Sequence, residues 1–461
     1  MGRTAQRAHM ELFGTAGIRG DVRATVTPEL ALTVGRAAGA DGGEFVLGRD
    51  GRTTGGGIAD AMAAGLRSAG ADVVRLGQVP TPTVGWASRD RRGVVITASH
   101  NPPTDNGIKL FADGQEYDDD AEAAVEARVE ADADPAAWHD WGTSTTADLL
   151  EEYRRAVVAY ASDYGAPLDG LLVAVDCGNG MASLAVPQVL RELGADVHAL
   201  HANVDGHFPG RESKPTPESL GDLHEFVADG DADLGIGHDG DADRIVVVDS
   251  DGEVVHEDTV LAILAERYVR AATAEDSVVL TTPNASGRID ERVDAAGGRV
   301  ERVRLGALHV GIAAVREGAT AETSVAFAAE PWKHIHTRFG GWIDAVASAA
   351  VFSRLVADEG LATLREPVTE RPYRKTEVRC PDDDKAAAMG LLTERLPGVF
   401  PDAGVDTEHG VRLTFEDNSW VLVRPSGTEP YVRLYVESDD VDALVDEVRG
   451  VMETAVADVS D

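Results

Sequence analysis

Three stretches of the chain share one pattern: the end of a helix, then a glycine, then a β-branched strand. They span residues 67–76, 191–200 and 294–303, and Gly70, Gly194 and Gly297 mark the point where each helix would stop. A strand pattern precedes each of them (45–47, 171–175 and 278–280), and another follows (94–96, 232–236 and 324–327). Strand, helix, strand, crossover and strand is an α/β unit with a largely parallel sheet. A period of a hundred residues or more predicts tandem domains and not a solenoid.

The remaining segment, 367–461, reads differently. Strand patterns at 373–379, 411–416, 420–423 and 432–436 lie between two helices, which predicts a smaller α+β domain. We therefore predict three tandem α/β domains with mixed, largely parallel sheets, at 1–148, 149–251 and 252–366, followed by this fourth domain. Each third strand leads into a loop rich in reactive residues. Such loops lie at the carboxyl ends of parallel strands, where α/β sheets bind ligands, so we expect one shared central cleft.

The charge of the chain limits its partners. With 42 Lys and Arg against 80 Asp and Glu, the formal net charge is −38, and acidic residues occur in nearly every segment. The 43% hydrophobic content and the regular patterning argue against disorder. This composition resembles a halophilic cytoplasmic protein that should repel nucleic acid and anionic membranes. Two cysteines, no apolar run of membrane-spanning length and a polar N-terminus fit the same compartment.

The first reactive loop is centred on Ser99. The buried-strand pattern 94–96 ends in Thr97-Ala-Ser-His-Asn-Pro-Pro103, and the prolines should hold an open loop with Ser99 at its tip. An ordinary strand-to-loop turn would explain most such serines. However, the chain has only five lysines (Lys109, Lys214, Lys333, Lys375 and Lys385), so a lysine at 109 is notable. A serine is a poor nucleophile without help, and His100 and Lys109 are close enough in sequence to provide it.

The second reactive loop is His238-Asp-Gly-Asp-Ala-Asp-Arg244. Asp239, Asp241 and Asp243 at alternating positions of a tight turn offer oxygen ligands that suit Mg²⁺. An acidic turn without a ligand is the alternative in so acidic a chain, as the run 229–233 illustrates. A Ca²⁺-binding EF-hand is excluded, because Arg244 and Ser250 stand where that loop needs glycine and glutamate. Strand patterns on both sides favour a metal loop fixed between two strands.

Three other motifs carry charge or hydroxyl groups. Phe13-Gly-Thr-Ala-Gly-Ile-Arg-Gly20 places Arg19 where it could reach a phosphate, although a flexible glycine turn is the alternative. Gly48-Arg-Asp-Gly-Arg52 is better explained by a buried Arg–Asp pair that fixes a loop than by direct chemistry. Arg424-Pro-Ser-Gly-Thr428 follows a strand and combines an arginine with two hydroxyls and a glycine, which favours an anion-binding nest over a plain turn.

Taken together, these motifs resemble the α-D-phosphohexomutases over essentially the whole chain. Thr97–Pro102 with Asn106–Lys109 resembles the phosphoserine loop, Asp239–Arg244 the metal loop and Arg424–Pro430 the distal phosphate clamp. His238 and Ala242 replace residues of the usual metal loop without removing a ligand. Glu330-Pro-Trp-Lys-His334 departs further from the family's Gly-Glu-x-Ser-Gly-His sugar loop. Trp332 stands in place of Ser and Lys333 in place of Gly, so this motif does not fix the sugar.

The resemblance implies a mutase that interconverts hexose 1-phosphate and hexose 6-phosphate, of glucosamine, mannose or glucose, through a phosphoserine and a 1,6-bisphosphate. It implies Mg²⁺ as cofactor, held by Ser99 and the three aspartates, and hexose 1,6-bisphosphate as activator. The implied roles are catalysis for Ser99, His100, Lys109, Arg19 and Arg244; sugar binding for Glu330, Trp332, Lys333 and His334; and phosphate binding for Arg424, Ser426, Gly427 and Thr428. We expect a sugar phosphate as the only partner of a monomer or homodimer. A Mg²⁺-dependent sugar-phosphate phosphatase and a non-catalytic sugar-phosphate binding protein are the alternatives.

Overall fold

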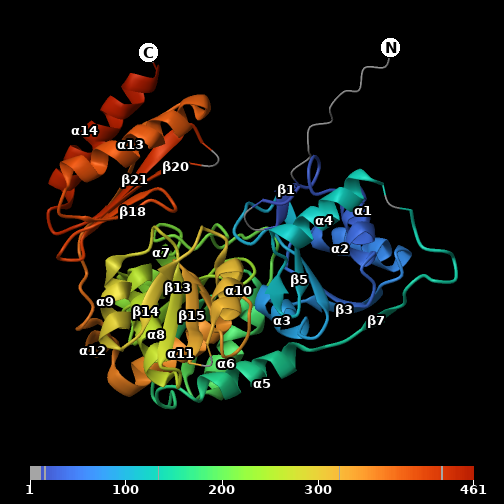
Figure 1. The fold of residues 1–461 in the computed structure, drawn as a ribbon. Coiled ribbons are helices and arrows are strands. Elements are labelled where there is room, and N and C mark those ends of the chain that lie inside the picture. The colour runs from blue at the N-terminus through green and yellow to red at the C-terminus, as the bar shows by residue number, and fades with distance from the viewer. Residues whose placement is uncertain (1–11, 15–16, 133, 321, 427–428, 461) are drawn as a thin grey trace, which may run out of the picture. The chain divides into compact units, whose positions relative to one another are not determined.

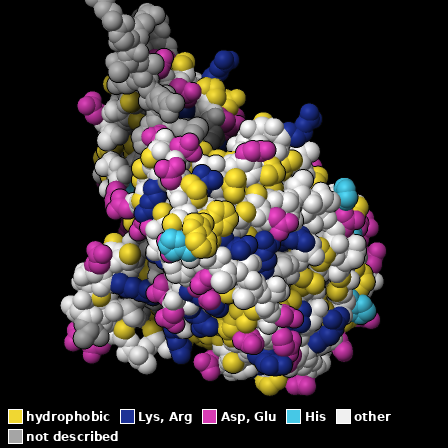
Figure 2. Space-filling model, turned by 90° about the vertical axis from the view of Figure 1, so that its right-hand side faces the viewer, with side chains coloured by type: hydrophobic (Ala, Val, Ile, Leu, Met, Phe, Trp, Pro, Cys, Tyr) yellow, Lys and Arg dark blue, Asp and Glu magenta, His cyan; other side chains and the backbone are white. Residues whose placement is uncertain are grey.

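The computed structural model describes residues 12–14, 17–132, 134–320, 322–426 and 429–460 (Figure 1). The chain forms two compact units. The first comprises the residues up to 257 together with 332–361, and the second comprises 258–331 together with 362–461. Within the described residues, no helix is long and apolar enough to cross a membrane. Figure 2 shows acidic side chains scattered over the visible face among hydrophobic and basic ones, not gathered in one patch.

The first sheet of the first unit is mixed. Its strands run in the order β1-β5-β4-β2-β3-β7, and β6 pairs with β5. The bounds are β1 Ile18–Asp21, β2 Glu44–Arg49, β3 Asp72–Gln78, β4 Arg92–Ile96, β5 Asp105–Ala112, β6 Gln115–Glu116 and β7 Ser144–Thr146. Strands β2, β3, β4 and β7 are parallel, whereas β5 and β1 run antiparallel to the strands that they pair with. The antiparallel pair β4–β5 returns the chain directly past the Ser99 loop.

Four helices belong to this sheet: α1 Pro28–Gly39, α2 Gly55–Ser68, α3 Thr81–Ala87 and α4 Asp119–Glu130. Helix α1 is capped by Thr27, whose side chain accepts a hydrogen bond from the Leu30 N–H. Helices α1 and α2 pack closely because a Cβ at Gly65 would lie 2.2 Å from the Leu32 carbonyl oxygen. Their apolar faces and the inner face of the sheet form one buried core.

The second sheet of this unit has the order β12-β11-β10-β8-β9. Its strands are β8 Leu172–Asp176, β9 Asp196–Leu200, β10 Leu234–His238, β11 Ile245–Val248 and β12 Val254–Val255. The unit also contains α5 Leu150–Ala161, the 3₁₀ helix Met181–Leu184, α6 Val186–Glu192, α7 Gly221–Ala228, β16 Lys333–Ile335 and α11 Ala345–Glu359. Strands β8, β9 and β10 are parallel, but β10 and β11 are antiparallel. Residues 239–244 are therefore the tight connection of a hairpin.

The second unit contains two further sheets. Parallel strands β13 Asp276–Thr281, β14 Arg299–Arg302 and β15 Thr323–Glu330 are accompanied by α8 Glu257–Ala271, α9 Gly287–Ala295 and α10 Leu308–Gly318. After α12 Leu361–Arg365, an antiparallel sheet has the order β17-β21-β20-β19-β18. Its strands are β17 Tyr373–Arg379, β18 Gly404–Asp406, β19 Val411–Thr414, β20 Trp420–Pro425 and β21 Tyr431–Glu437. The 3₁₀ helix Asp382–Asp384 leads into α13 Lys385–Val399, which lies beside α14 Val441–Ser460 on one face of this sheet (Figure 1).

The predicted fold class is confirmed, with corrections to some elements. Gly70, Gly194 and Gly297 adopt φ of 99°, 111° and 86° at helix ends, as the repeat predicted. The predicted strand 411–416 ends at Thr414, and β17 precedes α13, so not all strands of the last sheet lie between the two helices. Strand β18 was not predicted because its three residues are exposed and lack apolar alternation. The bounds of the four predicted domains and the shared central cleft stay predictions.

Candidate active site

Ser99 follows β4 and lies fully buried, not at the open tip that its prolines predicted. Its backbone is left-handed, with a φ of 52°, which is uncommon for a residue other than glycine. Its N–H donates to Thr97 Oγ1 at 2.9 Å. The Ser99 hydroxyl donates to Asp239 Oδ2 at 2.6 Å, and Asp243 Oδ1 lies 3.4 Å away. The turn therefore aims the serine away from solvent and into the aspartate loop.

Arg52 stabilises the backbone of the Ser99 loop. Its fully buried guanidinium pairs with Asp50 at 3.0 Å and donates to four backbone carbonyl oxygens of the loop, those of Ser99, Asn101, Pro102 and Asp105. Asp50 also accepts from Thr97 Oγ1 at 2.8 Å. Burial raises the pKa of Asp50 to about 6 despite this arginine. The predicted Arg–Asp pair thus has the structural role that the sequence indicated.

The aspartate loop carries a candidate metal site. One oxygen from each of Asp239, Asp241 and Asp243 lies within 4.8 Å of the others, and all three side chains are fully buried. Asp241 Oδ2 accepts from the Thr81 hydroxyl at 2.6 Å, but Asp241 Oδ1 is buried without a hydrogen-bond partner among the described residues. Buried carboxylate oxygens without donors are costly unless a cation joins them. The donor set therefore fits a hard divalent cation such as Mg²⁺.

Two small residues let the aspartate loop approach Ser99. A Cβ at Gly240 would lie 2.7 Å from the Ser99 carbonyl oxygen, so a side chain there would separate the two loops. Ala242 has a φ of 62°, which explains why glycine is the usual residue at that position. Asp239 Oδ1 accepts from the N–H groups of Asp243 and Arg244, both at 3.1 Å. These bonds fix the turn through Oδ1, whereas the Ser99 hydroxyl donates to Oδ2.

Three cationic side chains face Asp243. Lys109 Nζ and Lys333 Nζ lie 3.3 and 3.4 Å from its Oδ2, and Arg244 Nε lies 3.9 Å from its Oδ1. Burial alone would raise the pKa of Asp243, but Lys333, Lys109 and Arg244 hold it well below its usual range. Burial and the neighbouring carboxylates of Asp243 and Asp241 instead raise the pKa of Asp239 well above its usual range. Asp239 thus holds a proton more readily than Asp243.

The imidazole ring of His100 also contacts the Ser99 hydroxyl. Its Nδ1 lies 3.2 Å from Ser99 Oγ, and its Nε2 lies 3.4 Å from Arg244 Nη2. Because an arginine can only donate, Nε2 is the acceptor and the ring proton belongs on Nδ1, where it points at Ser99 Oγ. Burial, together with Arg244 and Arg19, lowers the pKa of His100 to about 2. His100 is therefore a neutral donor to the serine oxygen in this arrangement.

Lys109, the second predicted proton carrier, is held in its charged form. Its Nζ also donates to Glu116 Oε1 at 3.3 Å. Burial favours loss of its proton, but Glu116 and Asp243 outweigh burial and raise the pKa of Lys109 above its ordinary value. Arg19, on β1, is half-buried, and its Nε and Nη2 have no hydrogen-bond partner among the described residues. Both side chains add positive charge beside the aspartate loop.

The predicted sugar loop divides between the two units. Glu330 is in the second unit, where its Oε1 accepts from the Gly306 N–H at 2.6 Å. Trp332, Lys333 and His334 are in the first unit. The His334 Nδ1 bonds to Ser348 Oγ of α11 at 3.0 Å, and burial lowers the pKa of His334 to about 3. This histidine is fixed inside the protein, next to the segment that supplies Lys333.

The predicted phosphate clamp belongs to the second unit. Arg424 is half-buried, and its Nη2 donates to the Tyr435 hydroxyl at 2.9 Å, whereas its buried Nε has no partner among the described residues. Ser426 is buried, and Gly427 and Thr428 lie outside the described residues. Lys385 Nζ donates to the carbonyl oxygens of Ser426 and Glu429, each at 2.6 Å. A lysine that the sequence did not assign to the clamp thus fixes both ends of its loop.

Comparisons with known proteins agree with this geometry. Models of phosphoglucomutase/phosphomannomutase match three parts of the chain: α/β/α domain I at residues 10–136, α/β/α domain II at 151–252 and the C-terminal domain at 376–454. The chain belongs to the α-D-phosphohexomutase superfamily. It is therefore an isomerase that transfers phosphate within its substrate, as its relatives do, and the phosphatase and binding-protein alternatives are not favoured.

Individual relatives are similar over nearly their whole length. A phosphopentomutase from Thermococcus kodakarensis is 40% identical, over 93% of this chain and 94% of that protein. A probable phosphoglucosamine mutase from Methanopyrus kandleri is also 40% identical, over 96% of this chain and 98% of that protein. Among solved structures, a phosphoglucomutase/phosphomannomutase family protein from Burkholderia thailandensis superposes with a TM-score of 0.84 at 26% identity, covering 97% of both chains. These relatives belong to one family, but their names do not agree on the sugar.

Besides Lys385 at the clamp, sequence reasoning missed two residues beside the Ser99 and aspartate loops of this phosphohexomutase site. Thr81, at the start of α3, holds Asp241 through its hydroxyl and also donates its N–H to the Asp241 carbonyl oxygen at 3.0 Å. Glu116, in the short strand β6, pairs with Lys109. The Thr81 contact joins positions 160 residues apart, and nothing in the local sequence signals it. Glu116 lies seven residues after Lys109, so the return of β5 into β6 was the available signal.

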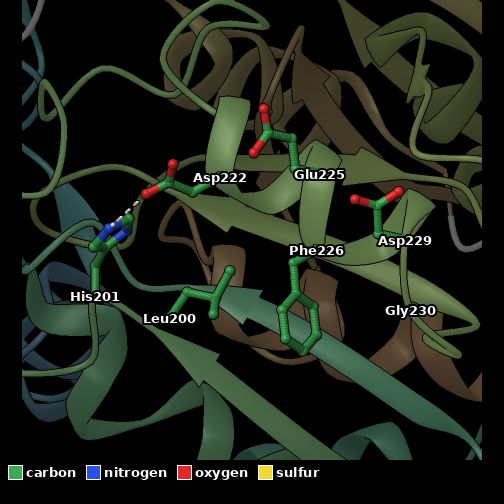
Figure 3. Close-up of a pocket in the computed structure, with 7 residues that line it drawn as sticks. All are labelled: Leu200, His201, Asp222, Glu225, Phe226, Asp229 and Gly230. Atoms are coloured by element: carbon green, nitrogen blue, oxygen red, sulfur yellow. Dashed lines mark ion pairs between the residues drawn. The ribbon is translucent and has the colours of Figure 1, made fainter.

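The mutase also has an acidic pocket of about 540 Å³ in its first unit, lined by Leu200, His201, Asp222, Glu225, Phe226, Asp229 and Gly230 (Figure 3). His201 Nε2 lies 3.2 Å from Asp222 Oδ2, which is the ion pair drawn in the figure. The carboxyl groups of Asp222, Glu225 and Asp229 belong to exposed residues. In contrast, the three aspartates that offer metal ligands, Asp239, Asp241 and Asp243, are all buried.

Proposed function

We propose that the protein interconverts the 1-phosphate and 6-phosphate of a hexose or hexosamine through phospho-Ser99 and a sugar 1,6-bisphosphate. The observation that carries this proposal is the buried Ser99 hydroxyl, 2.6 Å from Asp239 in a triad of carboxylates whose member Asp243 contacts three cationic side chains. Glucosamine phosphate is the first candidate substrate, because the name phosphoglucosamine mutase recurs among the relatives. A hexose 1,6-bisphosphate would start the cycle by phosphorylating Ser99.

In the first half of the reaction, the bond between phosphorus and Ser99 Oγ breaks and a bond to the free sugar hydroxyl forms. The hydroxyl loses a proton, and Ser99 Oγ gains one. The Nδ1–H of His100, 3.2 Å from Oγ, is placed to stabilise the oxygen that the phosphoryl group leaves. The second half reverses these changes at the other end of the bisphosphate, so that no proton or phosphate is consumed overall.

Mg²⁺ bound by Asp239, Asp241, Asp243 and Ser99 would supply positive charge for the transferring phosphoryl group. Arg244, Arg19 and Lys109 add fixed positive charge around the same point. We assign the phosphate that does not react to Arg424 and Ser426, with Gly427 and Thr428 of the same motif. We assign sugar hydroxyl recognition to Glu330, and His334 to the support of this loop and to sugar binding.

A pentose phosphate is the second candidate substrate. One relative with 40% identity carries the name phosphopentomutase, and Trp332 and Lys333 replace the small residues of the usual sugar loop. A bulkier loop favours a smaller sugar. In that case phospho-Ser99 would exchange the 1-phosphate and 5-phosphate of the pentose by the same two half-reactions.

The test is ³¹P NMR of the purified protein in molar KCl with Mg²⁺ and a trace of hexose 1,6-bisphosphate. Phosphates of glucosamine, N-acetylglucosamine, glucose, mannose and ribose are offered one at a time. Exchange between the 1-phosphate signal and the 6-phosphate signal of a hexose supports the proposal and identifies the sugar. Exchange with ribose phosphate alone supports the second candidate. Accumulation of inorganic phosphate with no exchange contradicts both.

Ser99→Ala provides the matching variant. It should abolish exchange, because among the described residues Ser99 supplies the hydroxyl that donates to Asp239. Ser353→Ala is the control, since Ser353 is also a buried serine but lies in α11 and its Oγ has no hydrogen-bond partner among the described residues. Retained exchange in Ser99→Ala would rule out the phosphoserine route.

A further inference from the structure

Lys333 is the clearest departure of this chain from the family pattern, and the structure places it away from the role that the pattern suggests. A glycine is usual at this point of the sugar loop. Here a lysine side chain is directed into the protein, and the residue is 8% exposed. Its Nζ lies 3.4 Å from Asp243 Oδ2. Lys333 therefore touches a candidate metal ligand.

The backbone fixes this placement. The Trp332 carbonyl oxygen accepts a hydrogen bond from the N–H of Ile245, the first residue of β11, at 3.1 Å. Trp332 has a φ of 70°, so the chain turns sharply just before Lys333. The indole ring of Trp332 lies 6.0 Å from the Arg244 guanidinium carbon. Both unusual residues of the loop are thus attached to the end of the aspartate loop.

The contact between Lys333 and Asp243 affects the balance of charge at the candidate metal site. Lys109 and Lys333 contact the same oxygen, Oδ2, while Ser99 Oγ lies 3.4 Å from the other oxygen, Oδ1. Two ammonium groups on one carboxylate oxygen repel each other, and both compete with any cation that Asp243 would bind. In a chain with five lysines among 42 basic residues, two of the five are on this one atom.

We propose that Lys333 belongs to the phosphoryl-transfer centre and not to the sugar pocket: it is an internal counter-ion of Asp243 that Mg²⁺ must displace and that then provides positive charge for the phosphoryl group on Ser99. The binding part of this inference needs only the metal site. Its kinetic part rests on the proposed function.

Mg²⁺ binding to the dephosphorylated protein tests the first part. Isothermal titration in fixed molar KCl is performed on wild type, Lys333→Met and Lys333→Gly, the last of which restores the usual residue. Both variants should bind Mg²⁺ about tenfold more tightly, because a buried competing charge is gone. Lys214→Met removes an equal charge from an exposed position and should bind Mg²⁺ like wild type. Unchanged affinity in both Lys333 variants would overturn the inference.

Steady-state kinetics with the sugar phosphate identified by NMR test the second part. Loss of a cation at the phosphoryl group should lower kcat by about tenfold or more and change KM by less than about threefold. A raised KM with an unchanged kcat would instead return Lys333 to the sugar pocket. If no sugar phosphate turns over, the proposed function fails while the Mg²⁺ titration still decides the binding part.

Wild-type protein provides a measurement that does not depend on variants folding. Its lysines are labelled by isotopic reductive methylation with and without saturating Mg²⁺, and the labelled peptides are quantified by mass spectrometry. Lys333 should react faster with Mg²⁺ present, because the cation displaces its side chain from the contact with Asp243 Oδ2 and frees it to meet the reagent. Lys214 serves as the internal reference. Equal labelling of Lys333 in both conditions would overturn the inference.

Discussion

The buried aspartate loop and the exposed acidic pocket are both rich in carboxylates, yet they have opposite surroundings. Asp239, Asp241 and Asp243 are fully buried and face a serine, a threonine and three cations. The acidic residues of the pocket are exposed, and among the described residues that line it His201 alone is basic. In so acidic a chain, carboxylate density alone does not identify a site. Burial and the arrangement of counter-charges distinguish the two regions.

The largest difference should come from removing one carboxylate in each region. Asp241→Asn should lower mutase activity by at least about 10²-fold and weaken Mg²⁺ binding, because it neutralises a buried ligand. Asp229→Asn in the pocket should leave activity within about twofold of wild type, since an exposed charge is well solvated. Parallel ³¹P exchange assays and Mg²⁺ titrations check both variants. Equal losses in the two variants would remove the distinction between the regions.

The next difference concerns the support of the Ser99 loop. Arg52→Met should lower the free energy of unfolding by about 3–5 kcal/mol, because it leaves Asp50 buried without its partner and four carbonyl oxygens without their donor. Arg75→Met removes an exposed pair with Asp60 and should cost less than about 1 kcal/mol. Urea unfolding monitored by far-UV circular dichroism measures both. A small loss in Arg52→Met would show that the loop is held by other contacts.

The two regions should also differ, by a smaller amount, in how their carboxylates couple Mg²⁺ binding to pH. The pKa of Asp239 is raised in the metal-free protein, so its contribution to stability is present at low pH and is lost as pH rises through that raised value. Mg²⁺ must displace this proton, so Mg²⁺ affinity should fall as pH is lowered, by up to about 1.4 kcal/mol per pH unit for one proton. Calorimetry in buffers of different ionisation enthalpy measures the release. Asp239→Asn should abolish it, whereas Glu225→Gln should not.

The smallest effect is expected inside the pocket itself. Asp222→Asn breaks the pair with His201, which is exposed on the aspartate side, and should change the free energy of unfolding by less than about 0.5 kcal/mol. The same urea protocol measures it. A loss of several kcal/mol would mean that this acidic pocket is as strongly coupled to the fold as the aspartate loop.

The sequence predicted the parts of the site that lie in contiguous motifs. The glycines after the repeated helices identified the α/β units, and the motifs around Ser99 and Asp239 identified loops that do meet in space. It also predicted the structural role of Arg52, because an Arg–Asp pair two residues apart after a strand can close on itself. These features depend on local spacing, which a sequence displays directly.

The remaining features depend on contacts between distant segments. The burial of Ser99 arises from its contact with a loop 140 residues away, which the local proline pattern cannot reveal. Thr81 supports Asp241 over a still longer separation. The motif placed Lys333 in the sugar loop but did not show its contact with Asp243, which follows the bond between Trp332 and Ile245. Side-chain direction was the information that the motif lacked.

The discontinuity of the first unit has a consequence for synthesis. Helix α11 buries most of its residues against α5, α6, β10 and β11, and the Tyr153 hydroxyl on α5 donates to Asp344, the cap of α11, at 2.9 Å. A ribosome therefore has to make more than a hundred residues after β10 before that apolar surface is covered. Until then, the nascent chain exposes a core that can aggregate or bind a chaperone. Lys333 is synthesised only shortly before this helix. The aspartate loop therefore gains the positive charge of Lys333 only at the stage when α11 can complete the first unit.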